Sequence, residues 1–291
     1  MPADALKGRT LVLAGPGRAG RAFARSWRRA GGRIAGIVTR SDPPPTDPAL
    51  AGAAAASWAD GSDLPESDVI ALAVSDDAIA EAAARLAPRS RARFAYHFSG
   101  ALSSALLSPF AAGPRRASIA SLHPVRPFTG SDHEDWAGAF VAVEGEEDAS
   151  REGEDILRAL GARPYRIAEE RKPLYHAAAS LAAGGVAAVL SVAVRAWEEA
   201  GIPDGVARET LSALAAGAAE AVGRRPFADA FTGAVARRDS GTVRVHTESL
   251  SRDADALSLY ASLAEEILRR TEGRGREDEI RAILGRNPAP K

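Results

Sequence analysis

Three glycines at fixed spacing are the clearest chemical signal in this sequence. Gly15, Gly17 and Gly20 stand in the segment GPGRAG, which fits the pattern GxGxxG. The first glycine allows a tight turn, the second lets a pyrophosphate approach the backbone, and the third lets a helix pack closely on a strand. The backbone N–H groups at the helix start, around Arg18 and Ala19, then point at the phosphates, aided by the helix dipole. The segment predicts a dinucleotide-binding turn.

The residues after the next β-prone run, 33–38, indicate which dinucleotide binds. An Asp or Glu at this strand tip would bind the ribose 2′-hydroxyl and repel a 2′-phosphate. The sequence has Thr39, Arg40 and Ser41 instead, which supply a planar cation and two hydroxyl groups suited to phosphate. We therefore predict NADP(H) rather than NAD(H). Asp42 comes one position late and favours NAD(H) only if its side chain turns into the site.

A second polar segment, AVSDDAI at 73–79, follows another apolar run. It lies where a strand ends and a helix begins, on the side of an open α/β sheet that forms the cofactor crevice. We predict that Val74 and Ser75 line this crevice, next to a ribose. The alternative is that Ser75 or Asp76 only caps the helix.

The segment KPLYHAAA, residues 172–179, carries the candidate catalytic residues. Pro173 fits the first turn of a helix, which makes Lys172 a cap residue and puts His176 near the positive helix start. Such an end attracts a carboxylate or phosphate and favours a neutral imidazole. We predict His176 as the proton donor or acceptor in hydride transfer, and Lys172 as the residue that binds or polarises the substrate. The alternative is a locally hydrogen-bonded histidine and a solvated lysine.

A second group of polar residues follows two further predicted strands. His97, Ser99 and Gly100 come at the end of one strand, and His123 comes at the end of another. These four are predicted to line the substrate pocket, although a structural, buried histidine is an equal alternative at position 123. The sequence has no close His/Asp/Glu ligand spacing, so no catalytic metal is predicted.

These residues need a parallel sheet to bring them to one edge. The β-prone runs are 10–14, 33–38, 68–74, 93–98, 117–121 and 139–144. Between the first two, Phe23 and Trp27 lie one turn apart on an amphipathic helix that ends at two glycines, and 79–86 reads as a second helix. The segment 42–48, DPPPTDP, reads as a surface connection.

Beyond about Arg171 the β-prone runs stop and Ala-rich helical segments take over. The predicted fold is therefore α/β, with a doubly wound Rossmann-type parallel sheet followed by an all-α C-terminal domain. We place the dinucleotide-binding domain at 1–170 and a helical substrate and dimerisation domain at 171–291.

Composition excludes several classes of function. Lys+Arg number 37 and Asp+Glu 38, a formal charge of −1, so no nucleic acid or anionic membrane partner is expected. Cysteine is absent, which excludes disulfides and thiolate chemistry. The first residues lack the apolar run of a signal peptide, so a cytoplasmic location is expected.

One uncharged segment, 177–194, has the length of a short membrane span. It is rich in Ala, Gly and Ser, so we expect a soluble protein in which this helix is buried inside a domain or between subunits. Gly184 and Gly185 cost about 1 kcal/mol each in a helix relative to Ala, which suggests that another backbone or the nicotinamide passes close by. A homodimer through the helical domain is predicted, with the active site in a cleft between domains or chains.

Six motifs in this order resemble a known family, the Rossmann-like proteins with a helical domain of unknown function numbered 2520 (DUF2520). The motifs are GPGRAG at 15–20, AVSDDAI at 73–79, HFSGALSS at 97–104, SLHPVRPF at 121–128, KPLYHAAA at 172–179 and TGAVARRD at 232–239. This family is related to 6-phosphogluconate dehydrogenase-like, pyrroline-5-carboxylate reductase-like and F420-dependent NADP reductase-like proteins. The resemblance implies a dimeric, oxidoreductase-like protein without an established substrate.

In related β-hydroxyacid dehydrogenase-like enzymes, a helix presents a Lys and then an Asn to the substrate. Lys172 is similar to that Lys, but the Asn would fall near Gly184, so its side-chain amide is missing. The leading hypothesis is an NADP(H)-dependent oxidoreductase acting on a small, anionic carbonyl or imine substrate. The alternatives are an NADP(H)-binding sensor without catalysis, and an enzyme that uses a deazaflavin as hydride partner, as F420-dependent NADP reductases do.

Overall fold

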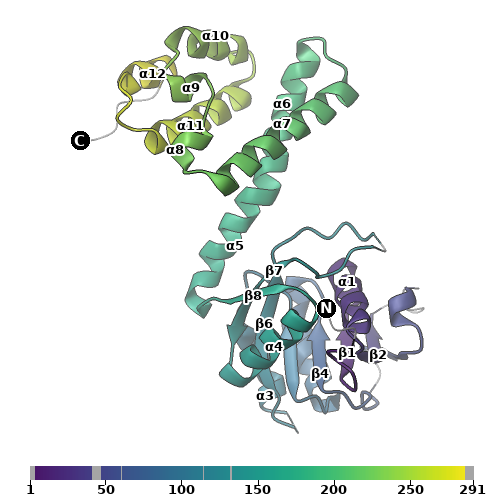
Figure 1. The fold of residues 1–291 in the computed structure, drawn as a ribbon. Coiled ribbons are helices and arrows are strands. Elements are labelled where there is room, and N and C mark those ends of the chain that lie inside the picture. Colours follow the sequence, from purple (N-terminus) through teal and green to yellow (C-terminus); the bar gives the residue numbers. More distant parts are fainter. Residues whose placement is uncertain (1–3, 41–46, 60, 114, 132, 286–291) are drawn as a thin grey trace. The chain divides into compact units, whose positions relative to one another are not determined.

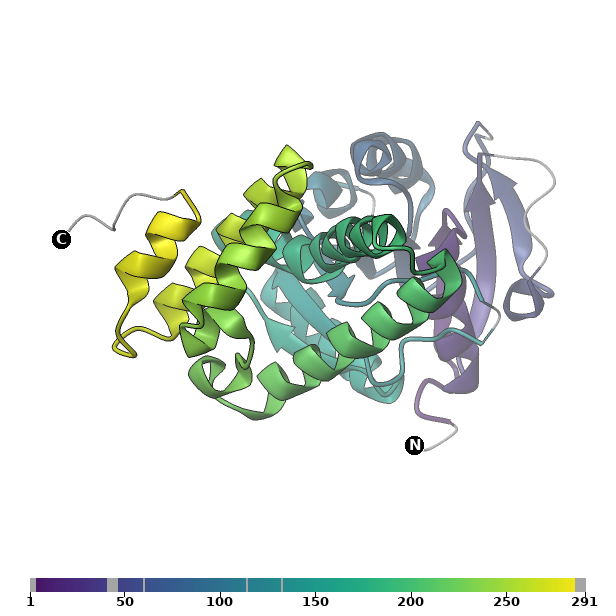
Figure 2. The same ribbon diagram turned by 90° about the horizontal axis from the view of Figure 1, so that it is seen from above.

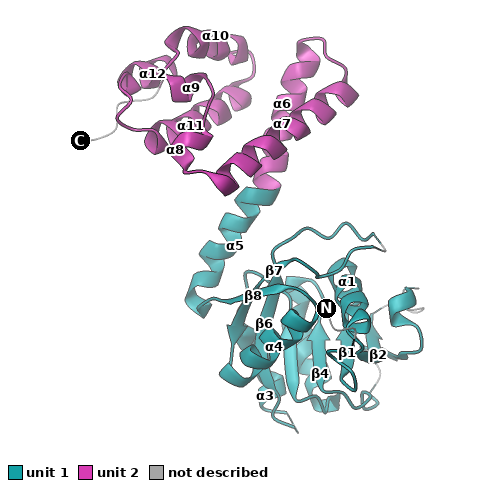
Figure 3. Cartoon of the chain, viewed as in Figure 1, with its two compact units in different colours: residues 1–183 teal, residues 184–291 magenta. Residues whose placement is uncertain are grey.

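The computed structural model describes residues 4–40, 47–59, 61–113, 115–131 and 133–285 (Figure 1). The chain divides into two compact units, Met1–Ala183 and Gly184–Lys291 (Figure 3). Unit 1 contains the sheet and the first part of the apolar helical segment. All secondary-structure elements in the described part of unit 2 are helices. Ser41 and most of the predicted connection at 42–48 lie outside the described residues.

Eight strands form one sheet in unit 1, in the order β3-β2-β1-β4-β5-β6-β7-β8. The strands are β1 (Thr10–Ala14), β2 (Arg33–Thr39), β3 (Ala54–Ser57), β4 (Val69–Leu72), β5 (Phe94–His97), β6 (Ser118–Pro124), β7 (Phe140–Gly145) and β8 (Arg163–Arg166). The order from β3 to β6 is the 3-2-1-4-5-6 order of dinucleotide-binding folds, which confirms the predicted Rossmann-type sheet.

The sheet is parallel except at one position. Strands β3 to β6 pair in parallel, but β7 pairs antiparallel with β6, and β8 is parallel to β7. A parallel connection needs a crossover, usually a helix, on one face of the sheet. The described residues between β6 and β7 contain no helix, so the chain turns back and pairs as a neighbouring antiparallel strand.

Helices cover both faces of this sheet, which explains why its central strands are apolar throughout. In β1, Leu11 and Leu13 join one buried cluster, whereas Val12 and Ala14 join the other. The helices of the first cluster are α1 (Arg18–Arg29) and α4 (Glu147–Ala159), and those of the second are α2 (Ile79–Leu86) and α3 (Ser108–Ala111). A parallel strand buried on both faces reads as a continuous apolar run.

The elements missing from the sequence interpretation lie at the sheet edges or carry polar sequences. β3 has the sequence AAAS and is mostly exposed at one edge, and β8 has the sequence RPYR at the other edge. Neither has the β-branched, alternating pattern that indicates a strand. Pairing with β2 and β7 supplies the hydrogen bonds that hold them extended.

Helix α5 (Lys172–Ser180) ends unit 1, and a π-helical turn, Leu181–Gly185, follows it. The helices of unit 2 are α6 (Val186–Glu199), α7 (Asp204–Arg224), α8 (Phe227–Ala230), α9 (Ala234–Arg237), α10 (Ser240–Leu250), α11 (Ala254–Arg270) and α12 (Glu277–Ile283). Helices α10, α11 and α12 pack together in both views (Figures 1 and 2) around Val243, Leu268 and Ile280.

The long apolar helix is not buried inside either compact unit. The continuous helical segment Glu169–Glu199 is long and apolar enough to cross a membrane by length and composition alone, and none of its apolar window is buried. Leu174 and Leu181 are 71% and 74% exposed. The expectation that this helix is buried inside a domain is therefore wrong, and burial between subunits stays a prediction.

One glycine of this helix, Gly184, has open surroundings among the described residues. A Cβ built on Gly184 would meet no atom within 4 Å. No described backbone therefore approaches Gly184 closely, and approach of the nicotinamide or of a second chain stays a prediction. Gly184 instead lies in the π-helical turn, in which five residues, Leu181–Gly185, form a wider turn than in an α-helix.

Candidate functional site

The glycine turn between β1 and α1 is built as the GxGxxG spacing predicts. Gly15 has φ +74°, and its N–H donates to Val38 O at 2.9 Å. A Cβ on Gly15 would lie 2.5 Å from Val74 Cγ1, and one on Gly20 would lie 2.8 Å from Ala73 Cβ. Gly17 differs, because the nearest atom to its built Cβ is 3.9 Å away. Two glycines are therefore fixed by close packing, and the middle one faces open space.

A cavity of about 280 Å³ lies beside this turn, at the carboxyl ends of β1, β2 and β4. Its lining residues are Gly15, Pro16, Thr39, Arg40, Trp58, Val74, Ser75 and Ala78. Five of these were predicted from the sequence to bind a cofactor. Arg18, Ala19, Gly17 and Gly20 belong to the adjoining turn and first turn of α1. Among the described residues no carboxylate lines the cavity, and Arg40 supplies a cation, so the described lining fits the phosphorylated ribose end of a dinucleotide.

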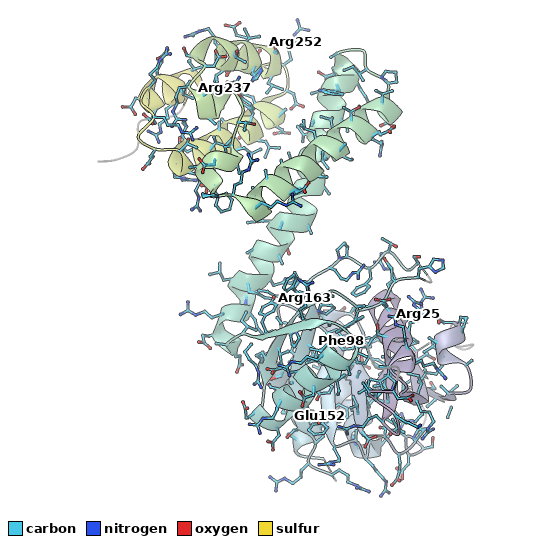
Figure 4. The ribbon with its side chains drawn as sticks, in the orientation of Figure 1. Arg25, Phe98, Glu152, Arg163, Arg237 and Arg252 are labelled. Carbon is cyan, nitrogen blue, oxygen red and sulfur yellow. The ribbon has the colours of Figure 1, made fainter. Side chains whose placement is uncertain are left out.

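The sequence of the first turn of α1 leaves its backbone N–H groups available to bind an anion. It contains no acidic residue, and Gly17, which precedes it, has no side chain to cap it. The helix is fixed from outside, because Arg25 donates to Glu134 O at 2.7 Å and Phe98 packs against Phe23, with ring centroids 5.0 Å apart. Figure 4 labels Arg25 and Phe98. The N–H groups at the start of α1 are thus held in place without blocking their anion-binding end.

A second polar cluster surrounds Lys172, the first residue of α5. Its Nζ donates to Ser121 Oγ at 2.6 Å and to Ser99 O at 3.3 Å, and lies 3.3 Å from a carboxylate oxygen of Glu144. Lys172 is 2% exposed and Glu144 5%. The alternative of a solvated Lys172 is therefore wrong. Lys172 is also a helical residue rather than the predicted cap, because a 3₁₀ turn, Glu169–Arg171, leads directly into α5.

The cluster joins four segments that are far apart in the sequence. Glu144, from β7, also accepts from Ser104 N at 2.9 Å and from Ser104 Oγ at 2.6 Å. Burial lowers the pKa of Lys172, and the neighbouring Glu144 carboxylate opposes that shift. A buried charge of this kind is tolerated only when it is paired and hydrogen-bonded. The ammonium therefore ties α5 to β6, to β7 and to the loop after β5.

His97 supports that loop from inside. Its Nδ1 accepts from Ser99 N at 3.1 Å, so Nε2 carries the proton and donates to Ser103 O at 3.1 Å. The residue is fully buried, and burial together with the Lys172 charge lowers the pKa of His97 to about 4. Ser99 is engaged as well, because its Oγ donates to Asp76 Oδ2 at 2.8 Å and accepts from Leu102 N. Both side chains shape the loop that leads to Gly100.

Two imidazoles converge on Gly100. A Cβ on Gly100 would lie 2.5 Å from His176 Cδ2 and 2.7 Å from His123 Nε2. The two rings meet edge to face, with centroids 5.6 Å apart. Tyr175 OH lies 2.8 Å from His123 Nδ1 and accepts from Tyr165 OH at 3.1 Å. Tyr175 therefore donates its proton to Nδ1, and His123 keeps its N–H at Nε2, on the side of the ring that faces Gly100.

The charge state of this pair follows from its surroundings. Burial, then the neighbouring His176 and Lys172, lower the pKa of His123 to about 4. Burial and the hydrogen bond from Tyr165 raise the pKa of Tyr175. At neutral pH the pair is therefore an uncharged imidazole and an uncharged phenol. A neutral imidazole N–H can donate a hydrogen bond to a substrate oxygen without carrying a charge into the site.

The structure brings most of the predicted substrate residues to one edge of the sheet. Ser99, Gly100, His123, Lys172 and His176 meet at the carboxyl ends of β5 and β6. Sequence reasoning missed four participants, which are Asp76, Ser121, Glu144 and Tyr175. One of them had a readable signal, since Glu144 is a single carboxylate that ends the apolar run FVAV. Among the described residues, no group of three or more His, Asp and Glu side chains could hold a metal ion.

A larger cavity, about 490 Å³, lies elsewhere in unit 1. It is at the amino end of β5 and β6, where Arg93 and Ser118 stand, and it faces carboxylates of α4 such as Glu152. None of the predicted site residues lines it. Ligands of open α/β sheets bind at the carboxyl ends of the strands, so we assign the site to the smaller cavity beside the glycine turn.

Residues 139–267 match the family described as Domain of unknown function (DUF2520), which confirms the resemblance inferred from the motifs. None of the curated proteins matches the chain. Protein TM1727 from Thermotoga maritima has the same fold, at TM-score 0.71 and 22% identity, over 90% of this chain and 98% of that chain.

Two reductases share the fold at lower similarity. Pyrroline carboxylate reductase from Plasmodium falciparum, with NADP bound, aligns at TM-score 0.58 and 13% identity over 96% of this chain and 99% of that one. An imine reductase from Myxococcus stipitatus, in complex with NADP+, aligns at TM-score 0.57 and 17% identity over 95% and 93%. At these identities the likeness concerns the fold.

Proposed function

Starting from a chain that carries a DUF2520 domain and a Rossmann-type sheet, we propose that the protein is an NADP(H)-dependent oxidoreductase. The observation that carries this proposal is the cavity beside the glycine turn, which has Arg40 at its rim and no carboxylate among its described lining residues. Two of the solved structures with the same fold contain NADP or NADP+, which supports the same cofactor here.

Each part of the cofactor has a matching group in the chain. The backbone of Gly15 and Gly17 and the start of α1 would hold the pyrophosphate. Arg40 would hold the 2′-phosphate, because a guanidinium presents several N–H donors in the geometry of a phosphate. Val74 and Ser75, at the end of β4, would border a ribose. When bound, the cofactor supplies or accepts a hydride at its nicotinamide.

The residues around Gly100 would handle the proton that accompanies the hydride. Reduction of a C=O or C=N bond adds one hydride to carbon and one proton to oxygen or nitrogen. His176 is the proposed proton donor, and the uncharged His123 can hydrogen-bond the same substrate atom through its Nε2–H. A small, anionic carbonyl or imine compound is the proposed substrate class, since His176 lies near the start of α5, the positive end of the helix dipole, which attracts a carboxylate or phosphate.

Lys172 acts in this proposal through position rather than through direct contact. Its ammonium is already engaged by Ser99, Ser121 and Glu144, so it holds the loop and strand that carry Gly100 and His123. Its positive charge also favours the uncharged form of His123. This differs from the role expected from the sequence, in which Lys172 binds or polarises the substrate.

The test combines cofactor binding with turnover. NADPH and NADH are titrated separately by calorimetry, and NADPH oxidation is followed with pooled 2-oxo acids, 3-oxo acids and cyclic imines. We expect tighter binding of NADPH than of NADH, turnover with at least one pool, and loss of turnover with retained NADPH binding in His176→Ala. His246→Ala, on α10 in unit 2, is the matched control. Tighter binding of NADH, or of neither nucleotide, contradicts the proposal.

One observation favours a second function, an NADP(H) sensor without catalysis. The lysine that related enzymes present to substrate is engaged by the protein itself, and Gly184 stands where those enzymes have an amide. NADPH binding without turnover on any pool, combined with an unchanged NADPH affinity in His176→Ala, would support the sensor.

We also propose that the exposed apolar helices are covered by a second copy of the chain. Helix α7 carries Leu214, which is 68% exposed, and the apolar window before it is equally uncovered. A contiguous apolar surface of this kind marks an interface with protein or membrane, and the small residues of this helix favour protein. Light scattering after gel filtration is expected to give a dimer, and Leu214→Glu to give monomer. Flotation of the wild-type protein with lipid vesicles would contradict the dimer.

A further inference from the structure

Arg40 already has two partners at the rim of the cavity. Its guanidinium carbon lies 4.4 Å from the centroid of the Trp58 ring. Its Nη2 donates to Glu81 Oε2 at 3.1 Å. The first partner is an aromatic face and the second is an anion, so the guanidinium is both supported and neutralised. Neither Trp58 nor Glu81 belongs to the glycine turn or to the other predicted cofactor residues.

Trp58 is fixed by contacts that do not depend on a ligand. Trp58 follows β3 directly. Its backbone N–H donates to Thr39 O at 3.1 Å, which ties the residue to the tip of β2. The buried Arg89 holds the same segment through Ser57 O at 3.1 Å and Ser62 O at 2.6 Å. Trp58 as a whole is 7% exposed. The ring is thus a rigid surface at the cavity wall.

Glu81 lies in the first turn of α2 and bridges two arginines. Its Oε2 accepts from Arg40, and its Oε1 accepts from Arg85 Nε at 2.9 Å. Its side chain is 49% exposed, so the bridge can be exchanged for another anion without burying an unpaired charge. An incoming phosphate would meet Glu81 as a competitor for the same guanidinium.

We propose that Trp58 and Glu81 set the preference of this site for an adenosine 2′-phosphate, with Trp58 holding the Arg40 guanidinium in position and Glu81 competing with the phosphate. The proposal rests on the proposed binding of NADP(H) at this cavity. A guanidinium can stack its face on a ring while its edge donates to a phosphate, so both contacts of Arg40 can persist together. A supported Arg40 also loses less conformational freedom when the phosphate binds.

The two contributions have opposite signs and affect only a ligand with a 2′-phosphate. NADH has a hydroxyl at this position, so it neither needs the guanidinium nor competes with Glu81. Loss of the aromatic support is therefore expected to weaken NADPH binding, and loss of the Glu81 charge to strengthen it. An exposed cation–π contact corresponds to a change of about threefold in affinity.

The experiment measures Kd for NADPH and NADH by calorimetry in the full chain. Trp58→Leu is expected to weaken NADPH binding about threefold or more and to change NADH binding less than twofold. Glu81→Gln is expected to tighten NADPH binding about threefold, with NADH unchanged. Adenosine 2′,5′-bisphosphate and 5′-AMP serve as smaller probes and are expected to follow NADPH and NADH respectively.

Matched controls come from the same chain. Trp197→Leu removes a tryptophan from α6, and Glu147→Gln removes a first-turn glutamate that also bridges two arginines, Arg151 and Arg166. Neither control is expected to alter the ratio of the two affinities. Trp58→Phe keeps an aromatic face and is expected to lie between wild type and Trp58→Leu, which covers the case in which the leucine variant does not fold.

The outcomes separate this inference from the proposed function. Binding of neither nucleotide by the wild-type chain overturns both. If NADPH binds to wild type but Trp58→Leu and Glu81→Gln leave the NADPH-to-NADH ratio within twofold, only this inference fails. Equal weakening of both nucleotides in Trp58→Leu makes Trp58 a support of the cavity as a whole and overturns its part in the preference.

Discussion

The glycine-turn cavity and the Lys172 cluster lie at the same edge of one sheet, but they are built in opposite ways. The cavity is formed by a short turn and strand tips, with backbone close to backbone and an open centre. The cluster is formed by four distant segments whose polar groups are buried and bonded to one another. The first is prepared to receive a ligand, and the second is already satisfied by the protein.

This difference indicates whether each region is damaged more by added atoms or by removed atoms. Atoms added at Gly15 would clash with their neighbours, because a Cβ on Gly15 would lie 2.5 Å from Val74 Cγ1. Atoms removed from the cluster leave a buried charge or donor without a partner, which costs more than the interaction itself contributed. Addition should therefore damage the cavity, and deletion should damage the cluster.

The largest effect is expected from Glu144→Ala, which leaves the Lys172 ammonium buried without its carboxylate. Loss of one partner of a buried ion pair costs about 3–5 kcal/mol of unfolding free energy. Urea denaturation measures it, with Glu147→Ala as the control, because that exposed ion-pair partner should cost less than about 1 kcal/mol. The double variant Glu144→Gln, Lys172→Met should recover most of the loss. A cost for Glu144→Ala no larger than the control would mean that Lys172 is solvated.

Acid should weaken the cluster before it affects exposed carboxylates. The pKa values of His97 and His123 are about 4 in the folded protein, below the ordinary value of 6.5. The unfolded chain therefore binds more protons between these values, so stability is complete above about pH 6.5 and falls as pH drops toward 4. The loss at pH 5 relative to pH 8 is on the order of 2 kcal/mol per histidine.

Urea denaturation at several pH values checks this acid sensitivity. His123→Gln should remove the contribution of one histidine to this loss of stability at acid pH. Glu134, whose pKa backbone hydrogen bonds lower to about 2, responds only at still lower pH. A stability that is constant from pH 8 to pH 5 would contradict the neutral, buried histidines.

Gly15→Ala tests the cavity by adding one methyl group. Overpacking against Val74 and the positive φ together are expected to cost about 2–3 kcal/mol, and NADPH binding should be lost. Gly52→Ala is the matched control, since Gly52 has the same φ of +74° and no atom within 4 Å of its built Cβ. It should cost about 1 kcal/mol, from its backbone conformation alone. Equal losses of unfolding free energy in the two variants would show that the Val74 side chain moves to accommodate the added methyl group.

The smallest effect is expected from Tyr175→Phe, which removes one hydrogen bond from His123. The expected cost is about 1 kcal/mol, and His123 should lose its single tautomer, which ¹H–¹⁵N spectra of the imidazole report. Tyr260→Phe is a matched control, because Tyr260 OH lies 3.0 Å from His246 Nδ1 in a more exposed pair. Unchanged His123 spectra in Tyr175→Phe would contradict the assigned direction of the hydrogen bond.

The sequence predicted the cavity better than the cluster for a physical reason. A dinucleotide turn is a local structure, so Gly15, Gly17 and Gly20 are readable from their spacing, and the strand tips at Thr39 and Ser75 follow from the order of short apolar runs. The strand 10–14 and the helix 79–86 were predicted with their observed limits. The edge strands β3 and β8 were missed, since their extended form comes from pairing rather than from their own residues.

By itself, then, the sequence determined the dinucleotide turn, the buried strands and the absence of cysteine chemistry, because each depends on residues that are close in the chain or on composition. Only the tertiary structure decided that β7 turns back antiparallel, that Glu144 meets Lys172, and that Trp58 lies under Arg40. These contacts join segments far apart in the sequence, and their distances depend on how strands pair and helices pack. The uncovered apolar helix belongs to the same class, since burial is a property of neighbours and not of the segment.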